Sequence, residues 1–253
     1  MNYKKFLLRF AYDGTDFYGW QIQKDRITIQ GVMEDALTKI FKSKTELVVS
    51  GRTDARVHAY NQYAHFSAET RMRPQNIIPA LNSLLPSSIF VKDCIEIPFE
   101  FHARFSAKSR TYLYKINKQF SPFDRNFTAF FPGKKINSKT IRSAIPYLIG
   151  SHDFEVFAND TSQLRHCFCT VISTEWEEDD SQYRLYITAN RFLHNMVRRI
   201  VGTLLKISHY NLENDYIKKI LEQKDYTLLG ATAPPQGLYL YEVAYEFPSE
   251  TEV

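Results

Sequence analysis

The chain opens with a strict alternation of side chains, which predicts a β-strand. One face of this strand would carry Phe6, Leu8, Phe10 and Tyr12, and the other would carry Leu7, Arg9, Ala11 and Asp13. A turn rich in Gly and Asp follows, with the sequence DGTDFYGW. Thr28 then has the character of an N-cap, and the apolar residues from Ile29 to Phe41 have helical spacing.

The next segments complete a common α+β order. Short apolar runs at residues 47–49 and 63–66 predict strands on either side of the segment GRTDARVHA. Residues 74–84 predict a helix with a proline at its start. Strand, helix, strand, strand, helix, strand is the ferredoxin-like order.

The second half alternates element types again without repeating the sequence. We predict strands at 110–117, 171–176, 183–188 and 238–247, and helices at 138–149 and 215–223. Gly150 is expected to cap the first of these helices. A further helix would bury Leu193, Val197, Ile200 and Leu204. Adjacent strands without intervening helices indicate an α+β protein with a largely antiparallel sheet.

Composition excludes several classes of protein. With 44% apolar and 24% charged residues, the 253-residue chain is an ordinary globular one. It has no apolar run of about 18 residues, so we expect no membrane span. The first apolar run is too short for a signal peptide, and we expect a cytoplasmic protein. Three cysteines cannot build a disulfide framework, and Cys167 and Cys169 lack a second ligand pair, so we expect no metal.

Positive charge is modest overall but gathered in patches. The net charge is +4 and aromatic residues make up 15% of the chain. The patches are Arg52–Arg56–His58, Arg104–Lys108–Arg110 and Arg198–Arg199. Cationic grooves with stacking surfaces are typical of RNA-binding proteins. A large core with solvated basic faces explains the same composition equally well.

The segment from Gly51 to His58 is the strongest local candidate for chemistry. A single carboxylate, Asp54, lies among Arg52, Arg56 and His58 between two predicted strands. Opposite charge favours the ionised form of a carboxyl group, which then serves as nucleophile, base or ion-pair partner. The alternative is an aspartate that caps a turn between solvated arginines.

Five separated segments resemble the TruA family of tRNA pseudouridine synthases, in the family's order and spacing. They are YDGTDFYGWQIQ with TIQGVMEDAL, GRTDARVHA with QYAHF, FHARFSAKSRTYLY, FLHNMVRRIVG and ATAPPQGLYLYEV. The resemblance implies the pseudouridine synthase fold, in which two ferredoxin-like (RRM-like) lobes share a largely antiparallel central sheet with helices packed on it. We place an N-terminal lobe with the catalytic aspartate at residues 1–104, and a C-terminal lobe that completes the active site at 105–253.

The resemblance also assigns roles to individual residues. Asp54 matches the family's catalytic aspartate, and Arg198 matches the arginine that pairs with it. Tyr112 matches the active-site tyrosine, which we expect to pack against the base, with proton transfer as a second role. Arg52 matches an arginine that enters the space left by the displaced nucleotide. Leu238 matches an apolar residue that lines the uracil pocket. Tyr112 and Leu238 as ordinary sheet residues are the structural alternative.

The implied activity is isomerisation of uridine to pseudouridine at positions 38, 39 and 40 of the tRNA anticodon stem-loop. Substrate and product are isomers, so the resemblance implies no cofactor and no metal. It implies a homodimer with tRNA as its partner. The rival interpretations are an enzyme acting on other uridines, a non-catalytic RNA-binding protein, and a basic protein with no role on nucleic acid.

The chain departs from the family pattern at two places. The family usually has glycine where this chain has Arg56, and a glycine there indicates a positive φ or a close backbone approach. Arg56 would then either adopt a strained turn or add a cation beside Asp54. The segment HCFCTV lacks an arginine that the family leads us to expect. Neither departure falls on Asp54, Tyr112 or Arg198.

Overall fold

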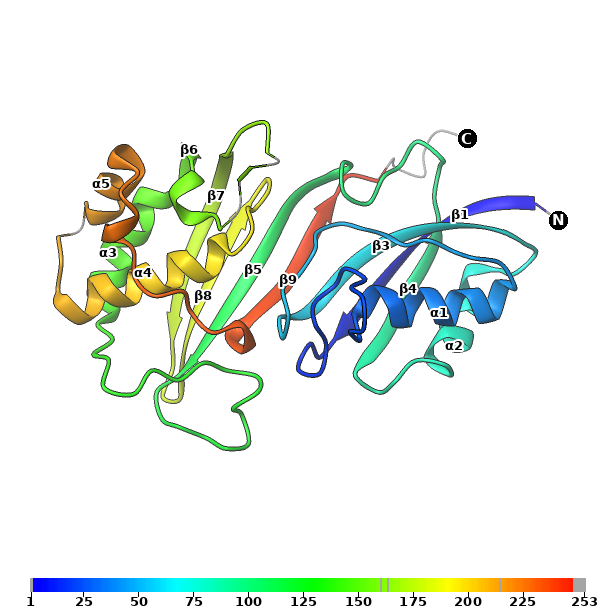
Figure 1. The fold of residues 1–253 in the computed structure, drawn as a ribbon, viewed down its shortest axis with the longest axis horizontal. Helices are drawn as coiled ribbons and strands as arrows, with labels where there is room; N and C mark the ends of the chain where they lie inside the picture. The colour runs from blue at the N-terminus through cyan, green and yellow to red at the C-terminus, as the bar shows by residue number, and fades with distance from the viewer. Residues whose placement is uncertain (1, 160, 163, 214, 248–253) are drawn as a thin grey trace. The chain divides into compact units, whose positions relative to one another are not determined.

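A computed structural model describes residues 2–159, 161–162, 164–213 and 215–247 (Figure 1). The chain divides into two compact units, the first made of Met1–Arg110 with Leu240–Val253 and the second of Thr111–Tyr239. Both boundaries fall inside strands, β5 (Ala107–Asn117) and β9 (Leu238–Tyr245). The predicted α+β class with a large, largely antiparallel sheet is confirmed. The functional division into lobes 1–104 and 105–253 stays a prediction.

The first unit has the predicted ferredoxin-like order. Its elements are β1 (Asn2–Tyr12), α1 (Ile29–Phe41), β2 (Val48–Val49), β3 (His58–Thr70), α2 (Pro74–Asn82) and β4 (Ile89–Glu96). In the sheet, β1 lies between β4 and β3, and β3 also pairs with β2 and neighbours β9. The pairs β1–β3, β1–β4 and β2–β3 are antiparallel.

The main core of this unit lies between the strands and the two helices. In Figure 1, α1 and α2 lie side by side against the strands. The Phe6 ring stacks on Phe66 with centroids 5.3 Å apart, and Phe10 packs on Trp20 at 5.9 Å. The Thr28 side chain accepts a hydrogen bond from the Gly31 amide, which confirms the predicted N-cap of α1.

The opposite face of β1 is covered as well, which the alternation alone did not indicate. Leu7 is 2% exposed and packs with Ile97 and Ala103, from the segment that follows β4. The Lys5 ammonium holds this segment by donating to the carbonyl oxygens of Phe99 and Phe101 at 2.8 and 2.6 Å.

The second unit places helices against a sheet of β5, β8, β7 and β6, in that order. Its helices are α3 (Ser138–Ala144), α4 (Met196–Tyr210) and α5 (Tyr216–Gln223), and its remaining strands are β6 (Gly150–Asp153), β7 (Phe168–Glu178) and β8 (Gln182–Ala189). Short 3₁₀ helices are η1 (Ile145–Leu148), η2 (Glu155–Phe157), η3 (Tyr226–Leu228) and η4 (Pro235–Gly237). The predicted inward residues Leu193, Val197, Ile200 and Leu204 are all buried.

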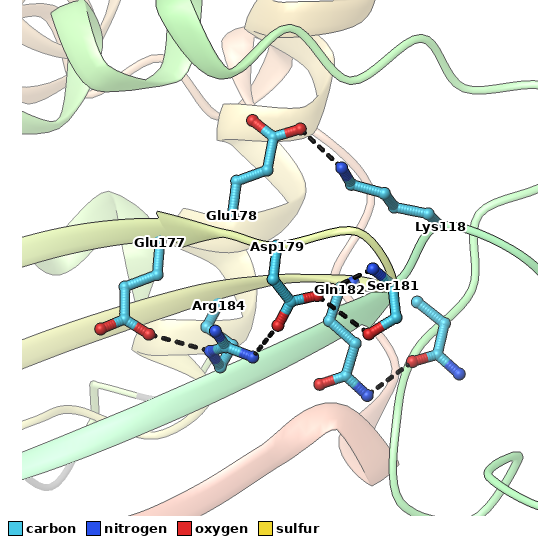
Figure 2. A network of polar contacts seen from close by, with 8 residues as sticks. Lys118, Glu177, Glu178, Asp179, Ser181, Gln182 and Arg184 are labelled. Atoms are coloured by element: carbon cyan, nitrogen blue, oxygen red, sulfur yellow. Dashed lines mark hydrogen bonds and ion pairs between the residues drawn. The ribbon is translucent and has the colours of Figure 1, made fainter.

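The turn of the β7–β8 hairpin is fixed by one carboxylate (Figure 2). Asp179 Oδ1 accepts from the backbone amides of Ser181 and Gln182, both at 2.8 Å, and Arg184 donates to Oδ2 at 2.6 Å. These hydrogen bonds hold the pKa of Asp179 well below its usual value. The hairpin register that they fix sets the start of β8, the strand that leads toward α4.

The helix predicted at 138–149 is shorter than expected, and the predicted cap is wrong. Helix α3 ends at Ala144, and the 3₁₀ helix η1 continues to Leu148. Pro146 has no amide hydrogen to donate to the carbonyl oxygen four residues before it, which interrupts the α-helical hydrogen bonds at this point. Gly150 has a φ of +111° but is the first residue of β6, because Ile149 already has extended geometry.

Candidate active site

The loop that carries Asp54 joins β2 to β3 in the first unit. Thr53 is buried, Asp54 is half-buried and Arg52 is exposed. The Val57 amide donates to the Asp54 carbonyl oxygen at 3.2 Å and closes the turn. The carboxylate therefore belongs to a tight, supported loop and remains partly accessible, which suits a group that meets a substrate.

The Gly-rich segment 13–20 packs against this loop through its backbone. The Trp20 amide donates to the Thr53 carbonyl oxygen at 3.0 Å, and the Arg56 amide donates to that of Phe17 at 3.2 Å. A Cβ on Gly19, whose φ is +84°, would lie 2.7 Å from the Thr53 oxygen, and one on Gly14 would lie 2.1 Å from a Val57 oxygen. The two glycines permit this close approach.

Arg56 adopts the conformation that the family pattern indicates for a glycine. Its φ is +64°, in the left-handed region, and its side chain is exposed. This confirms that the turn has a positive φ although the residue has a Cβ. A contact of the guanidinium with RNA, or its role as a cation beside Asp54, stays a prediction.

Three residues of the predicted basic patches have structural contacts. His58 is 1% exposed, and its Nδ1 accepts from the Gly14 amide at 3.0 Å. Arg110 is 9% exposed and donates to the carbonyl oxygens of Ser50 and Arg104. Arg199 donates to the carbonyl oxygens of Val156 and Ala158 at 3.1 and 2.8 Å. The two arginines hold backbone segments in place and His58 is buried, so the basic patches of the sequence overstate the charge offered to a ligand.

Tyr112 lies in β5, in the part of the strand that belongs to the second unit. It is 8% exposed, and its ring meets that of Phe192 edge-on at a centroid distance of 5.0 Å. Phe192 precedes α4, so this contact joins Tyr112 to the segment that leads to Arg198.

Arg198 lies in the first turn of α4 and is held on two sides. Its Nε donates to the Ala233 carbonyl oxygen at 2.8 Å, and its Nη1 donates to Asn195 Oδ1 at 2.7 Å. The Ala233 amide returns a bond to the Arg198 carbonyl oxygen at 3.1 Å. Asn195 has a φ of +62°, a conformation that asparagine tolerates better than most residues.

Leu238 starts β9 directly after the turn η4 and is 6% exposed. The preceding Gly237 lies against β5, and a Cβ there would be 2.8 Å from both the Lys115 oxygen and the Tyr114 ring. The Tyr114 hydroxyl donates to the Pro234 carbonyl oxygen at 2.8 Å. The segment from Pro234 to Leu238 is therefore fixed against β5 within the second unit.

The predicted site residues are thus divided between the units. Asp54 and Arg52 share one loop of the first unit, and Tyr112, Arg198 and Leu238 belong to the second. The pairing of Arg198 with Asp54 stays a prediction. Asn195, which supports Arg198, was not predicted as a site residue from the sequence; its signal was its place three residues before Arg198, one helical turn away.

Two further properties of the described residues bear on other kinds of site. No helix in the described part of the chain is long and apolar enough to cross a membrane. Among the same residues, no group of three or more His, Cys, Asp or Glu side chains has the arrangement of a metal site.

The chain is similar to known proteins over most of its length. A family model described as tRNA pseudouridine synthase matches residues 9–106 and 144–246. The tRNA pseudouridine synthase A of Caldicellulosiruptor bescii is 39% identical over 244 residues, covering 96% of this chain and 100% of the relative. The protein of the same name from Exiguobacterium sibiricum is 37% identical over 242 residues, covering 96% and 97%. These matches confirm the resemblance seen in the sequence: the chain belongs to the tRNA pseudouridine synthase family, a family of isomerases.

Proposed function

We propose that this protein isomerises uridine to pseudouridine at positions 38, 39 and 40 of the tRNA anticodon stem-loop, with Asp54 as the catalytic carboxylate. The observation that carries the proposal is the setting of Asp54. It is the half-buried carboxylate of a tightly supported loop, in a chain of the tRNA pseudouridine synthase family. A catalytic group held in one geometry avoids the cost of ordering it during the reaction.

The reaction exchanges one bond for another within the substrate. The bond from ribose C1′ to uracil N1 breaks, the base turns, and C1′ joins C5. C5 then loses its proton, and N1 gains one. Atoms and electrons balance without an oxidant, a reductant or an energy source, so we propose that no cofactor and no metal take part. The carboxylate attacks the nucleotide or stabilises the charge that develops as the first bond breaks.

The other site residues have roles that fit their chemistry. We assign Arg198 as the cation that pairs with the Asp54 carboxylate, since a planar guanidinium binds carboxylates through two parallel hydrogen bonds. Tyr112 offers a ring for packing against the uracil, and Leu238 an apolar wall. We assign Arg52, which is exposed in the Asp54 loop, to the space left by the displaced nucleotide. Taking a base out of its stack costs a few kcal/mol, which an inserted side chain offsets.

The proposed substrate requires recognition by shape. Three neighbouring nucleotides present different contacts to one active site, so the enzyme would read the RNA backbone and fold of the anticodon arm in preference to base edges. We propose that it does so as a homodimer in the cytoplasm, where its tRNA partner is found. Backbone contacts from lysine and arginine make such binding salt-dependent.

Pseudouridine mapping in tRNA tests the proposal. We expect tRNA from cells that lack the gene to lose pseudouridine at positions 38, 39 and 40, and a plasmid copy of the gene to restore it. A copy carrying Asp54→Asn should not. Loss at other uridines would identify an enzyme with another target. Unchanged modification, with tRNA binding retained by the purified protein, would identify a non-catalytic RNA-binding protein.

A further inference from the structure

A chain of buried polar side chains lies beneath the Asp54 loop. Its members are Tyr12 in β1, Gln62 in β3, and Ser50 and Thr53 on either side of Gly51, with exposed fractions of 4%, 0%, 1% and 7%. The Tyr12 hydroxyl lies 2.7 Å from Thr53 Oγ1, and Ser50 Oγ donates to Gln62 Oε1 at 2.7 Å. Burying polar groups this completely costs their hydration, so each group needs hydrogen bonds within the protein to replace it.

The orientation of the Gln62 amide is fixed by backbone groups whose roles are unambiguous. Its Oε1 accepts from its neighbour's amide, that of Tyr63, at 3.1 Å, and its Nε2 donates to the Gly51 carbonyl oxygen at 2.9 Å. A flipped amide would turn its NH₂ group toward the Tyr63 amide and its oxygen toward the Gly51 carbonyl oxygen, which opposes donor to donor and acceptor to acceptor. The Nε2 group, 3.4 Å from the Tyr12 hydroxyl oxygen, therefore donates to it.

This orientation sets the direction of the remaining bond. The Tyr12 oxygen accepts from Gln62, and its own buried proton needs an acceptor, which Thr53 Oγ1 provides at 2.7 Å. Burial raises the pKa of Tyr12 to about 12, so the phenol stays a neutral donor at physiological pH. The Thr53 hydroxyl then accepts the hydrogen bond from Tyr12. Gln62, Tyr12 and Thr53 thus form a hydrogen-bond chain with one polarity.

The chain holds the loop at the two residues that flank Arg52. Gly51 is held through its carbonyl oxygen by Gln62, and Thr53 through its hydroxyl by Tyr12. The Thr53 carbonyl oxygen also accepts from the Trp20 amide at 3.0 Å, so both ends of this residue are fixed. Thr53 immediately precedes Asp54, and the direction of its backbone determines where the Asp54 side chain points.

We propose that the Gln62–Tyr12–Thr53 hydrogen-bond chain positions the Asp54 carboxylate for the reaction, so that Tyr12 and Gln62 are positioning residues of the enzyme. This inference rests on the proposed function. Apolar side chains of similar shape would fill the same volume, but a fully bonded polar chain selects one arrangement of the loop among several of similar packing. A displacement of about 1 Å in a catalytic group lowers the rate by up to about a hundredfold.

Hydroxyl deletions that preserve shape test the proposal. Tyr12→Phe and Thr53→Val each remove the contact between the two hydroxyls, while Thr53→Ser retains the Thr53 hydroxyl. We expect the single-turnover rate of pseudouridine formation to fall about tenfold to a hundredfold in the first two variants. Thr53→Ser should stay within about threefold of the wild type. The Kd for tRNA should be unchanged in all three variants.

The double variant Tyr12→Phe/Thr53→Val sharpens the test. Two groups that act through one bond are not additive, so the double variant should be no slower than the slower single variant. Tyr216→Phe is the matched control, because it removes a phenol bond to the Leu228 carbonyl oxygen away from the predicted site residues. All variants are assayed well below their melting temperatures. Thr53→Val, nearly isosteric with threonine, and Thr53→Ser, which keeps the hydroxyl and loses one methyl group, decide the question if Tyr12→Phe does not fold.

The possible outcomes separate this inference from the proposed function. An inactive wild-type protein, with tRNA bound, would contradict the proposed function and the inference with it. An active wild type whose Tyr12→Phe and Thr53→Val variants keep rates within about twofold would overturn the inference alone. Equal losses in Thr53→Ser and Thr53→Val would also overturn it, because the hydroxyl would then be irrelevant.

Discussion

Gly202→Ala should destabilise the second unit, although alanine is the better helix former. Gly202 lies within α4, and a Cβ there would be 1.8 Å from the Ala231 carbonyl oxygen. Real Cβ contacts are not shorter than 3.0 Å, so helix and backbone must separate by at least about 1.2 Å. The obstacle is a backbone atom, so no rotamer change relieves the clash.

The magnitude follows from two opposed terms. Alanine gains about 1 kcal/mol over glycine in a helix interior. Overpacking costs about 1–3 kcal/mol and more where the surroundings are rigid, as here. We expect the free energy of unfolding to fall by about 2 kcal/mol, which lowers Tm by roughly 4–8 °C in a protein of this size. The displaced segment includes Ala233, so the bond from Arg198 Nε should weaken and the rate of pseudouridine formation should fall too.

Gly31→Ala is the matched control for this prediction. Gly31 also lies in a helix, but its added Cβ would meet only side-chain atoms, at 3.2 and 3.8 Å. The nearer atom is Thr28 Oγ1, the N-cap acceptor of α1, and a side chain can shift by the few tenths of an ångström that are needed. Helix propensity and this shift oppose each other, so the stability of the control should stay within about 1 kcal/mol of the wild type. Urea unfolding and calorimetry measure both variants. A Gly202→Ala protein as stable as Gly31→Ala would refute the argument from close packing.

The remaining predictions concern the cations of the site and the absence of a metal. Arg198→Met should lower the single-turnover rate more than Arg198→Lys, because lysine restores charge but not the planar fork; equal rates would show that the geometry is irrelevant. Asn195→Gly should fold normally but lose several-fold in rate, since it accepts the positive φ while removing the acceptor for Arg198 Nη1; an unchanged rate would remove Asn195 from the account. Arg56→Gly should raise the free energy of unfolding by up to about 1 kcal/mol, and a salt series for tRNA binding should become less steep by about one unit if the arginine contacts a phosphate; an unchanged slope would exclude that contact. Activity should survive dialysis against a chelator, and a requirement for one specific divalent ion would contradict the proposed chemistry.

The parts of the fold that depend on local signals could be predicted from the sequence. The alternation in β1, the Thr28 cap of α1 and the proline that begins α2 are determined by residues close in the chain. The lengths of the strands could be predicted less well. The run at 63–66 indicated a short strand, but β3 extends from His58 to Thr70 because it pairs with the whole of β1. The partner determines the ends of a strand, and a local pattern does not reveal the partner.

The same distinction applies to the site. Asp54 was found through a motif, and the positive φ of Arg56 through the glycine usual at that place in the family. The contacts of Tyr12 with Thr53 and Gln62 span 41 and 50 residues of sequence, so no local pattern contains them. Arg110 has the pattern of a surface cation, yet its guanidinium is buried against carbonyl oxygens because the loop at 104–107 folds over it.

The central claim is that the Asp54 carboxylate is essential for the chemical step, and the Asp54→Asn variant tests it most directly. Asparagine keeps the shape and removes the charge on which nucleophilic or electrostatic catalysis depends. The measurement is single-turnover formation of pseudouridine in a tRNA substrate, with tRNA affinity measured in the same buffer. We predict no detectable product and a Kd within a few-fold of the wild type. Substantial product formation by Asp54→Asn would contradict the assignment.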